Sequence, residues 1–443
     1  MEFPDADTVD ELVDDVSFPT FATVRQTPDT DRVADVPAAA RDAAERLLSD
    51  RPTELDAGAS VAVGLGSRGI TDVVPVASAV VAVLRERGFD PFVVPAMGSH
   101  GGASAVGQRR TLDALGLNEA SLDCPIDARM ETVVLERDAD GGPDAHLATA
   151  VAEADAFLVV NRVKPHTNFT GNVESGLCKM TAIGLGKRPG AAAVHARAAE
   201  EGYVPAIVET METIRAASPA AFLGGVAVVE NFAEETARVA GVPVADLPGA
   251  EAELLETARR EMATLPVSDL DVLVVERLGK DVSGTGMDTN VVGRYGVLGS
   301  DDPEKPRIDR IVALGLTEET HGNGHGIGLV DLTTVDIAES LDLEQMYANA
   351  LTSGSLSRDA IPVALPSERL ALAAACTTAG PYDPETVRIA WIRDTSHLGE
   401  LRVSEALARD VERGAFGDAR VGERWELTFE DGTAGFDSVN ESE

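Results

Sequence analysis

Short apolar runs alternate with longer amphipathic stretches along most of this chain. The runs are rich in Val, Ile and Leu, which is typical of strands buried on both faces of a parallel sheet. They predict strands at 60–66, 90–97, 154–164, 222–232, 269–279, 310–316, 327–335 and 387–393. The stretches between them place apolar residues at helical spacing. They predict helices at 38–48, 73–88, 103–115, 249–264, 336–350 and 400–412.

Strands that alternate with helices form βαβ units, in which the strands are parallel. The sequence therefore predicts an α/β protein with two domains, each built on a mainly parallel, Rossmann-like sheet, and an active site in the cleft between them. Pro266 and the short polar segment after it place the boundary near residue 265, so the predicted domains span 1–265 and 266–443. The last residues, 435–443, are expected to be disordered.

The chain is strongly acidic. Its 443 residues include 75 Asp and Glu against 37 Lys and Arg, which gives a formal net charge of −38. The acidic residues are spread over the whole chain, which is typical of a halophilic protein whose self-repulsion is screened by salt. Such a surface argues against nucleic acid as a partner, because binding a phosphate backbone needs a basic surface.

Neither membrane insertion nor export is indicated by the sequence. No apolar run reaches the ~20 residues that a membrane-spanning helix needs, and the acidic N-terminus does not resemble a signal peptide. The three cysteines, Cys124, Cys178 and Cys376, are far apart and form no CxxC motif, so no disulfide framework is expected. We therefore expect a cytoplasmic protein with no membrane partner.

Four basic side chains follow predicted strands. Arg68, His100, His166 and Lys280 each stand just beyond the end of one. In open parallel sheets, ligands bind beyond the carboxyl ends of the strands. These four residues are therefore candidates for contacts with a ligand.

Glycine-rich segments surround two of these candidates. GLGSRG (64–69) matches the GxGxxG turn of dinucleotide-binding proteins, but no acid follows the next strand to hold a ribose. A plain turn and a turn that presents Arg68 to a ligand both stay open. In GSHGGAS (98–104), the glycines would allow close approach of a ligand to His100, which favours a functional histidine. HGNGHG (321–326) has an HxxxH spacing, but its glycines favour a flexible loop over a helical metal site.

The segment 161–195 concentrates the scarce basic residues. The chain has five lysines, and three of them, Lys164, Lys179 and Lys187, lie here. Lys179 stands in an apolar, Gly-rich run, so its amine must be paired, covalently used or turned to a cavity. Lys187 is expected on a solvent-facing turn, and Lys164 is interpreted as a secondary anion contact. His195 stands on a predicted helix.

Taken together, these residues resemble the lactate racemase family that depends on a nickel-pincer nucleotide. The resemblance covers most of the chain and is strongest in 60–200 and 275–294. It rests on an ordered set of motifs, which are the Arg in GSRG, the His in GSHGG, the His in KPHTN, the Lys in GLCKM, the His in AAAVH and the Lys in RLGKD. The family's cofactor is a pyridinium mononucleotide with two sulfur-containing arms that hold nickel.

The resemblance implies an isomerase that racemises or epimerises a 2-hydroxy acid by hydride transfer to and from this cofactor. It implies a catalytic, cofactor-binding N-terminal domain and a C-terminal domain that closes the site. It also implies a role for each residue: Lys179 carries the cofactor covalently, His195 binds nickel, His100 and His166 exchange protons, and Arg68 and Lys280 hold the substrate carboxylate. Neutral imidazole suits both proton exchange near neutral pH and nickel binding. The implied partners are a small hydroxy acid and the enzymes that make the cofactor.

The chain departs from the family pattern in the first Gly-rich turn. Leu65 stands where the family has an acid, and Ser67 stands where it has Thr. A hydroxy acid related to lactate is therefore a safer expectation than lactate itself. Two alternatives remain at this point, an NAD-type hydroxy acid dehydrogenase and a non-catalytic nucleotide- or metal-binding relative. The missing ribose acid and the absence of a role for Lys179 and His195 count against the dehydrogenase.

Overall fold

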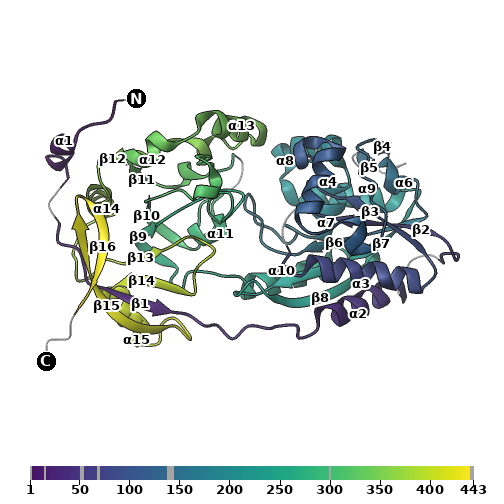
Figure 1. Cartoon of the computed structure of the whole chain (residues 1–443), viewed down its shortest axis with the longest axis horizontal. Helices are drawn as coiled ribbons and strands as arrows, with labels where there is room; N and C mark the ends of the chain where they lie inside the picture. Colours follow the sequence, from purple (N-terminus) through teal and green to yellow (C-terminus); the bar gives the residue numbers. More distant parts are fainter. Residues whose placement is uncertain are drawn as a thin grey trace. The chain divides into compact units, whose positions relative to one another are not determined.

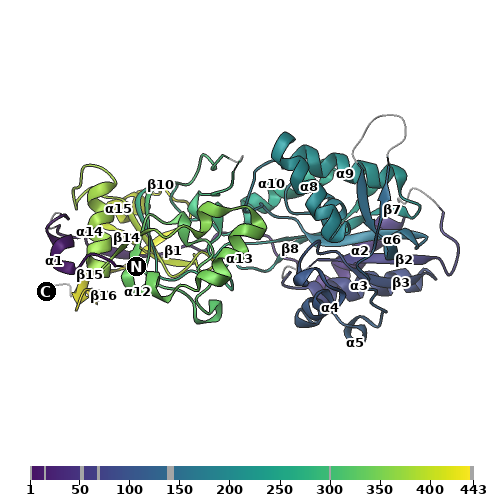
Figure 2. The same cartoon turned by 90° about the horizontal axis from the view of Figure 1, so that it is seen from above.

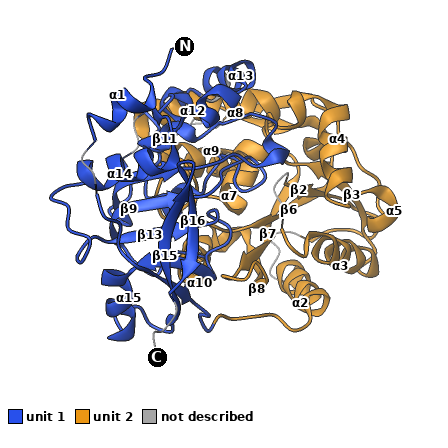
Figure 3. Ribbon diagram, turned by 60° about the vertical axis from the view of Figure 1, so that its left-hand side comes forward, with its two compact units in different colours: residues 1–29, 263–443 blue, residues 30–262 orange. Residues whose placement is uncertain are grey.

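The structure is a computed structural model that describes residues 2–13, 16–49, 54–66, 70–136, 144–298 and 301–439. It divides into two compact units, coloured separately in Figure 3. Unit 2 spans residues 30–262, and unit 1 combines residues 1–29 with residues 263–443. The chain leaves unit 2 close to the boundary expected at residue 265, but its first residues fold with the C-terminal part.

Unit 2 is built on a five-stranded sheet with the order β3-β2-β6-β7-β8. The first four of these strands are parallel, and β8 runs antiparallel at the edge. A separate antiparallel pair, β4 and β5, completes the β-structure described for this unit. The strands are β2 Ser60–Leu65, β3 Asp90–Pro95, β4 Thr132–Leu135, β5 Ala145–Ala148, β6 Ala156–Arg162, β7 Ala221–Glu230 and β8 Thr236–Pro243.

Helices cover both faces of this sheet. Successive strand residues point to opposite faces, so Val61 and Val63 pack under α2 and α3, while Ala62 joins the core under α8, α9 and α10. Figure 1 shows α2 and α3 along one face, and Figure 2 shows α8 beside α9. The helices are α2 Val36–Ser49, α3 Val73–Glu86, α4 Ala105–Ala114, α5 Glu119–Leu122, α6 Thr149–Ala152, α7 Leu177–Lys179, α8 Lys187–Glu201, α9 Tyr203–Ala217 and α10 Gly249–Glu261.

Unit 1 is built on a nine-stranded mixed sheet with the order β12-β11-β10-β9-β13-β14-β1-β15-β16. The five strands from β12 to β13 are parallel, and the remaining pairings are antiparallel. The strands are β1 Phe21–Arg25, β9 Asp269–Val275, β10 Arg307–Ala313, β11 Leu332–Thr334, β12 Val363–Leu365, β13 Ile389–Ile392, β14 Glu400–Ser404, β15 Arg420–Glu430 and β16 Thr433–Ser438.

One face of this sheet packs against α14, and Phe21 of β1 joins the same core as Val272 and Trp391. Phe21 meets the Trp391 ring edge-on, with ring centroids 6.2 Å apart. The helices are α1 Ala6–Asp10, α11 Thr289–Val292, α12 Val335–Ser340, α13 Leu343–Ser353, α14 Glu368–Thr378 and α15 Glu405–Glu412. None of the helices in the described ranges is long and apolar enough to cross a membrane.

The predicted α/β class with mainly parallel strands is confirmed, and most predicted elements lie within a few residues of their expected bounds. Two C-terminal predictions are wrong. The helix expected at 400–412 is a strand, β14, followed by the shorter helix α15. The first part of the tail expected to be disordered, residues 435–438, belongs to β16, because β15 supplies an antiparallel partner for it; residues 440–443 lie outside the described residues.

Candidate functional site

The carboxyl ends of the parallel strands of unit 2 meet at one edge of its sheet, and two of the candidate residues lie there. His100 follows β3 and is exposed, while His166 follows β6 and is half-buried. Arg68, expected beyond β2, lies outside the described residues. The shared direction of the strands therefore brings the two histidine-bearing loops to the same edge.

Residues 164–175 form the loop that carries His166. Backbone hydrogen bonds close this loop at its base, and a side chain of α10 holds it. Lys164 and Ser175 exchange backbone hydrogen bonds of 3.0 and 3.2 Å. The Glu174 carboxylate accepts the backbone N–H groups of His166 and Gly171 and receives the guanidinium of Arg259 on α10 at 2.6 Å. Glu174 is 1 % exposed, so these bonds satisfy a carboxylate that would otherwise be buried alone. The clamp fixes the backbone that carries His166.

His166 pairs directly with Lys179. The backbone N–H of Asn168 donates to His166 Nδ1 at 3.1 Å, and His166 Nε2 lies in hydrogen-bond contact with Lys179 Nζ. Because Nδ1 accepts, the hydrogen-bond network assigns the proton of the neutral ring to Nε2. When this Nε2–H donates to the lysine, Nζ accepts with the lone pair of its uncharged form. An amine presented in this way is a nucleophile.

A row of aromatic rings links this pair to His195. The His166 ring lies 4.5 Å from the Phe169 ring, which stacks on Tyr203 at 4.5 Å between centroids. Tyr203 meets the His195 ring edge-on at 5.7 Å, and its hydroxyl lies 3.3 Å from His195 Nδ1. The structure therefore brings His166, Lys179 and His195 into one cluster joined by ring contacts.

His195 lies on α8, toward the middle of the helix. Its side chain is exposed, and its pKa is lowered by the surrounding protein atoms and, secondarily, by the charged form of Lys179. A lowered pKa favours the neutral imidazole that binds metals. Among the described residues there is no group of three or more His, Cys, Asp or Glu that could hold a metal by itself.

The turn that carries Lys179 is irregular. Leu177–Lys179 is a short α-helical turn that continues into a π-helical turn, Met180–Gly184. Such turns inside helices are frequent at functional sites. Glu251 of α10 receives the backbone N–H of Cys178 at 2.8 Å, and its Oε1 is buried without a hydrogen-bond partner. A Cβ on Gly176 would lie 2.5 Å from that oxygen, so only glycine fits there.

Replacing Glu251 with Gln should change how stability depends on pH. Burial raises the pKa of Glu251 from 4.5 to about 7. The folded carboxyl keeps its proton while the unfolded one has lost it, so the native protein loses stability as pH rises from 4.5 through 7. The difference in unfolding free energy, wild type minus variant, should fall by about 3 kcal/mol between pH 4 and 8. Urea unfolding at several pH values measures it. Glu253→Gln, an exposed position on the same helix, should show no such slope, and equal slopes in both variants would contradict the assignment.

Lys187 is not on a solvent-facing turn, so this prediction was wrong. The side chain is 0 % exposed. Its Nζ donates to the Pro95 carbonyl at 2.7 Å and to Gln108 Oε1 at 3.1 Å. Gln108 Nε2 in turn donates to the carbonyls of Gly98 and His100 at 2.9 and 3.4 Å. Burial lowers the pKa of Lys187 to about 8. A buried lysine thus holds the loop that carries His100.

Close packing ties the Gly-rich turns to the Lys179 segment. A Cβ on Gly66 would lie 3.0 Å from the Met180 methyl, and one on Gly98 would lie 3.3 Å from the Ile183 carbonyl. The backbone N–H of Gly98 donates to the Gly184 carbonyl at 3.0 Å. The glycines after β2 and β3 therefore let both turns pack on the helical turns around Lys179.

Lys280 lies in unit 1, in the loop that follows β9, where it is half-buried. Its Nζ donates to Asn349 Oδ1 at 2.7 Å. The nearby HGNGHG segment is not a helical metal site: His321 is exposed at a left-handed position, and His325 is buried and bonded to Asp359. The segment is a loop and not a helix, and its glycines pack closely against neighbouring backbone and side chains.

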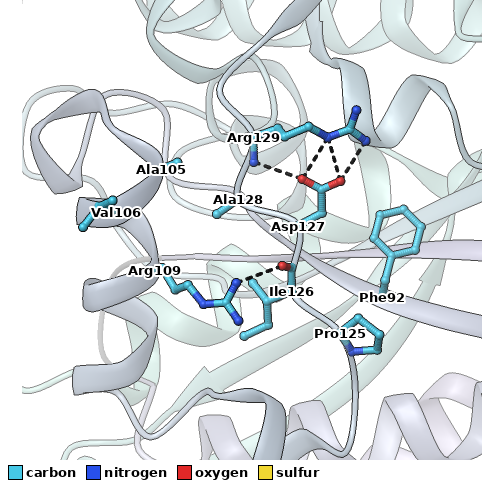
Figure 4. A pocket seen from close by; sticks show the side chains of 9 residues that line it. All are labelled: Phe92, Ala105, Val106, Arg109, Pro125, Ile126, Asp127, Ala128 and Arg129. Atoms are coloured by element: carbon cyan, nitrogen blue, oxygen red, sulfur yellow. Dashed lines mark hydrogen bonds and ion pairs between the residues drawn. The ribbon is translucent and has the colours of Figure 1, made fainter.

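A hollow of about 680 Å³ lies elsewhere in unit 2, between α4 and the segment before β4 (Figure 4). It is lined by Phe92, Ala105, Val106, Arg109, Pro125, Ile126, Asp127, Ala128 and Arg129. Its two guanidinium groups are already engaged: Arg109 contacts Glu119 and the Ile126 carbonyl, and Arg129 pairs with Asp127 and Glu153. The hollow contains none of the candidate site residues.

Several residues of this site gave no signal in the sequence. Glu174, Glu251 and Arg259 look like ordinary charges of an acidic chain, and Tyr203 starts a helix. Their partners are up to 85 residues away along the chain, so no local pattern joins them. The one local signal that could have identified them as site residues is a position inside or beside an apolar run, as for Lys179.

Residues 66–269 match the model of a family described as a domain of unknown function, DUF362. Among solved structures, the chain is similar to the lactate racemase apoprotein from Thermoanaerobacterium thermosaccharolyticum. The two share 11 % sequence identity and a TM-score of 0.41, over 74 % of this chain and 91 % of that chain. A comparison with curated proteins finds no match.

Proposed function

We propose that this protein is an isomerase that racemises or epimerises a 2-hydroxy acid by hydride transfer, with a nickel-pincer nucleotide linked to Lys179. The observation that carries the proposal is the contact between His166 Nε2 and the Lys179 amine. This contact presents an uncharged amine, which a covalent link to a cofactor requires.

The residues around Lys179 fit such a group. Lys179 would hold it covalently, and His195, at the other end of the aromatic row, would bind its nickel. The described residues offer His195 without a surrounding set of protein ligands, which suits a metal whose other ligands belong to the cofactor. When bound, the group would accept a hydride from the substrate carbon and return it to either face.

The chain's own residues would supply the rest of the chemistry. His166 and His100 would take and return the proton of the substrate hydroxyl, one for each orientation of the hydroxy acid. A covalent link at Lys179 would use the amine lone pair, which leaves His166 Nε2 available to the substrate. Arg68 and Lys280 would hold the carboxylate. Asn168 and Glu174, through their contacts to the His166 ring and backbone, would keep the imidazole in place.

A panel of hydroxy acids, offered as single stereoisomers to protein produced with the cofactor-synthesis enzymes, tests this function. We expect inversion at the hydroxyl-bearing carbon without incorporation of solvent deuterium, because a hydride does not exchange with water. His100→Ala and His166→Ala should each lower the rate about 10²- to 10⁴-fold, the usual contribution of a proton-transferring residue. Chiral chromatography measures the rate, and His397→Ala, an exposed histidine of unit 1, serves as control.

Two results would count against the proposal. Inversion with deuterium incorporation would indicate proton abstraction from carbon instead of hydride transfer. Full activity in either histidine variant would remove that histidine from the mechanism while leaving the other assignments to be judged by their own variants.

A further inference from the structure

The start of α9 lies against both the His166 loop and His195. α8 ends at Glu201 and α9 begins at Tyr203, so Gly202 alone joins the two helices. Its φ of 88° is positive, which glycine tolerates better than any other residue, and the two helices pack side by side (Figure 2). This tight turn brings Tyr203 back beside His195, which stands eight residues earlier in the chain.

Stacking fixes the orientation of the Tyr203 ring. The ring lies on that of Phe169, with an interplanar angle of 9° and 4.5 Å between centroids, and Phe169 is 5 % exposed. The neighbouring Val204 packs closely on the same loop, since a Cβ on Gly171 would lie 2.3 Å from its Cγ2. A ring stacked on a buried aromatic side chain has little freedom to turn, so the phenol oxygen keeps its place.

This oxygen lies 3.3 Å from Nδ1 of His195, and the two rings meet edge-on at 81°. A neutral imidazole carries one N–H, and the nitrogen that carries it determines what the other nitrogen can do. When Nδ1–H donates to the phenol oxygen, Nε2 keeps a lone pair with which it can bind a metal. When the phenol O–H donates to Nδ1 instead, Nε2 carries the proton and cannot bind one.

We propose that Tyr203 is a positioning residue for His195: its phenol oxygen accepts Nδ1–H and thereby leaves the Nε2 lone pair for nickel. The proposal deepens the proposed function, on which it rests for the identity of the metal. Histidines that bind metals almost always donate their other N–H, which sets the tautomer and the orientation of the ring. A phenol oxygen can accept this bond while its own O–H donates to another group, so the role is compatible with further bonds of Tyr203.

Tyr203→Phe tests the hydroxyl separately from the ring, because the variant keeps an aromatic ring to stack on Phe169. Long-range ¹H–¹⁵N spectra of histidine-labelled, cofactor-free full-length protein show which ring nitrogen carries the proton, and His195→Gln identifies the His195 signals. At pH 8.5, about two units above the ordinary pKa of imidazole, we expect the wild-type proton on Nδ1. In Tyr203→Phe the ratio of the two tautomers should shift towards Nε2–H about fivefold, the effect of one ordinary hydrogen bond.

The second measurement is the nickel affinity of protein produced with the cofactor-synthesis enzymes, followed by competition with a chelator. Loss of a residue that orients a metal ligand usually lowers metal affinity about 10- to 100-fold, and we expect this loss in Tyr203→Phe. The matched control is Tyr347→Phe, which changes a tyrosine of α13 in unit 1 that is 55 % exposed. It should leave both the tautomer of His195 and the nickel affinity unchanged.

A wild-type His195 that carries its proton on Nε2 would overturn the proposal, whether or not the variant folds. A Tyr203→Phe protein with the wild-type tautomer ratio and nickel affinity would overturn it as well, because the ring without its hydroxyl would then be sufficient.

The tautomer measurement needs no cofactor, so this proposal and the proposed function fail separately. A protein that forms no adduct at Lys179, while Nδ1 of His195 carries the proton, would remove the isomerase function and leave Tyr203 as the residue that fixes this tautomer. Inversion of a hydroxy acid by a protein whose His195 carries its proton on Nε2 would do the reverse.

Discussion

Lys179→Ala should abolish both the covalent adduct and the isomerase activity. Intact-mass spectrometry of protein produced with the cofactor-synthesis enzymes should show an added mass in the wild type and none in the variant. Because the proposed chemistry depends on the tethered group, the rate should fall to that of the uncatalysed reaction, at least about 10⁶-fold. Lys305→Ala, an exposed lysine paired with Asp269, should retain adduct and activity. An adduct that persists in Lys179→Ala would move the attachment site elsewhere.

The same lysine can be tested without any cofactor. We infer that the contact with His166 favours the uncharged form of the Lys179 amine, and only that form attacks carbonyl compounds. Reductive alkylation with formaldehyde and cyanoborohydride at pH 7 should therefore modify Lys179 before Lys305, as followed by peptide mass spectrometry. His166→Ala should remove the difference between the two lysines. Equal rates in the wild type would show that His166 does not hold the amine in this state.

Lys187→Met should destabilise unit 2 and loosen the loop that carries His100. The variant removes two hydrogen bonds and leaves the Pro95 carbonyl and Gln108 Oε1 buried without their donor. Unsatisfied buried groups cost about 1–3 kcal/mol each, so we expect a loss of about 3 kcal/mol in unfolding free energy. Amide exchange at Gly98–Ser104 should accelerate, since Gln108 would no longer be held against the Gly98 and His100 carbonyls.

The effect of Lys187→Met should grow with pH. The folded pKa of Lys187, about 8, lies below its ordinary 10.5, so the native state is stabilised by this group at high pH and loses that stabilisation as pH falls through 8. The stability difference between wild type and variant should therefore widen from pH 7 to 10. Arg188→Met, an exposed neighbour in the same turn, should change stability by less than about 0.5 kcal/mol. A stability difference that does not change with pH would contradict the lowered pKa of Lys187.

The positions of most parallel strands along the chain, and the strand-end positions of His100 and His166, could be predicted, because buried parallel strands leave continuous apolar runs. β1 could not, since its five residues at Phe21–Arg25 stand alone between prolines and polar segments. Its partners are β14 and β15, almost 400 residues away. Tertiary packing against partners so far away in the sequence, and not the local sequence pattern, determines that these five residues form a strand.

In the candidate site, too, features visible in the local sequence could be predicted, whereas those that depend on distant partners could not. Lys179 was marked by the apolar run around it, whereas Lys187 looked like a turn lysine because Gly186 and Pro189 flank it closely. Its burial depends on Pro95 and Gln108, which come from elsewhere in the chain. The pairing of His325 with Asp359 escaped notice for the same reason, since 34 residues separate them.

Unit 1 is built from both ends of the chain, and this affects how the protein can fold while it is being synthesised. β1 leaves the ribosome early, but its partner strands Glu400–Ser404 and Arg420–Glu430 emerge almost 400 residues later. Unit 2 is contiguous, so it can fold on the nascent chain while the first 29 residues wait. A fragment that starts at residue 263 would lack the strand between β14 and β15 and would expose two unpaired edges, which invite aggregation. Bacterial expression of this half should yield insoluble protein unless a peptide containing Phe21–Arg25 is supplied with it.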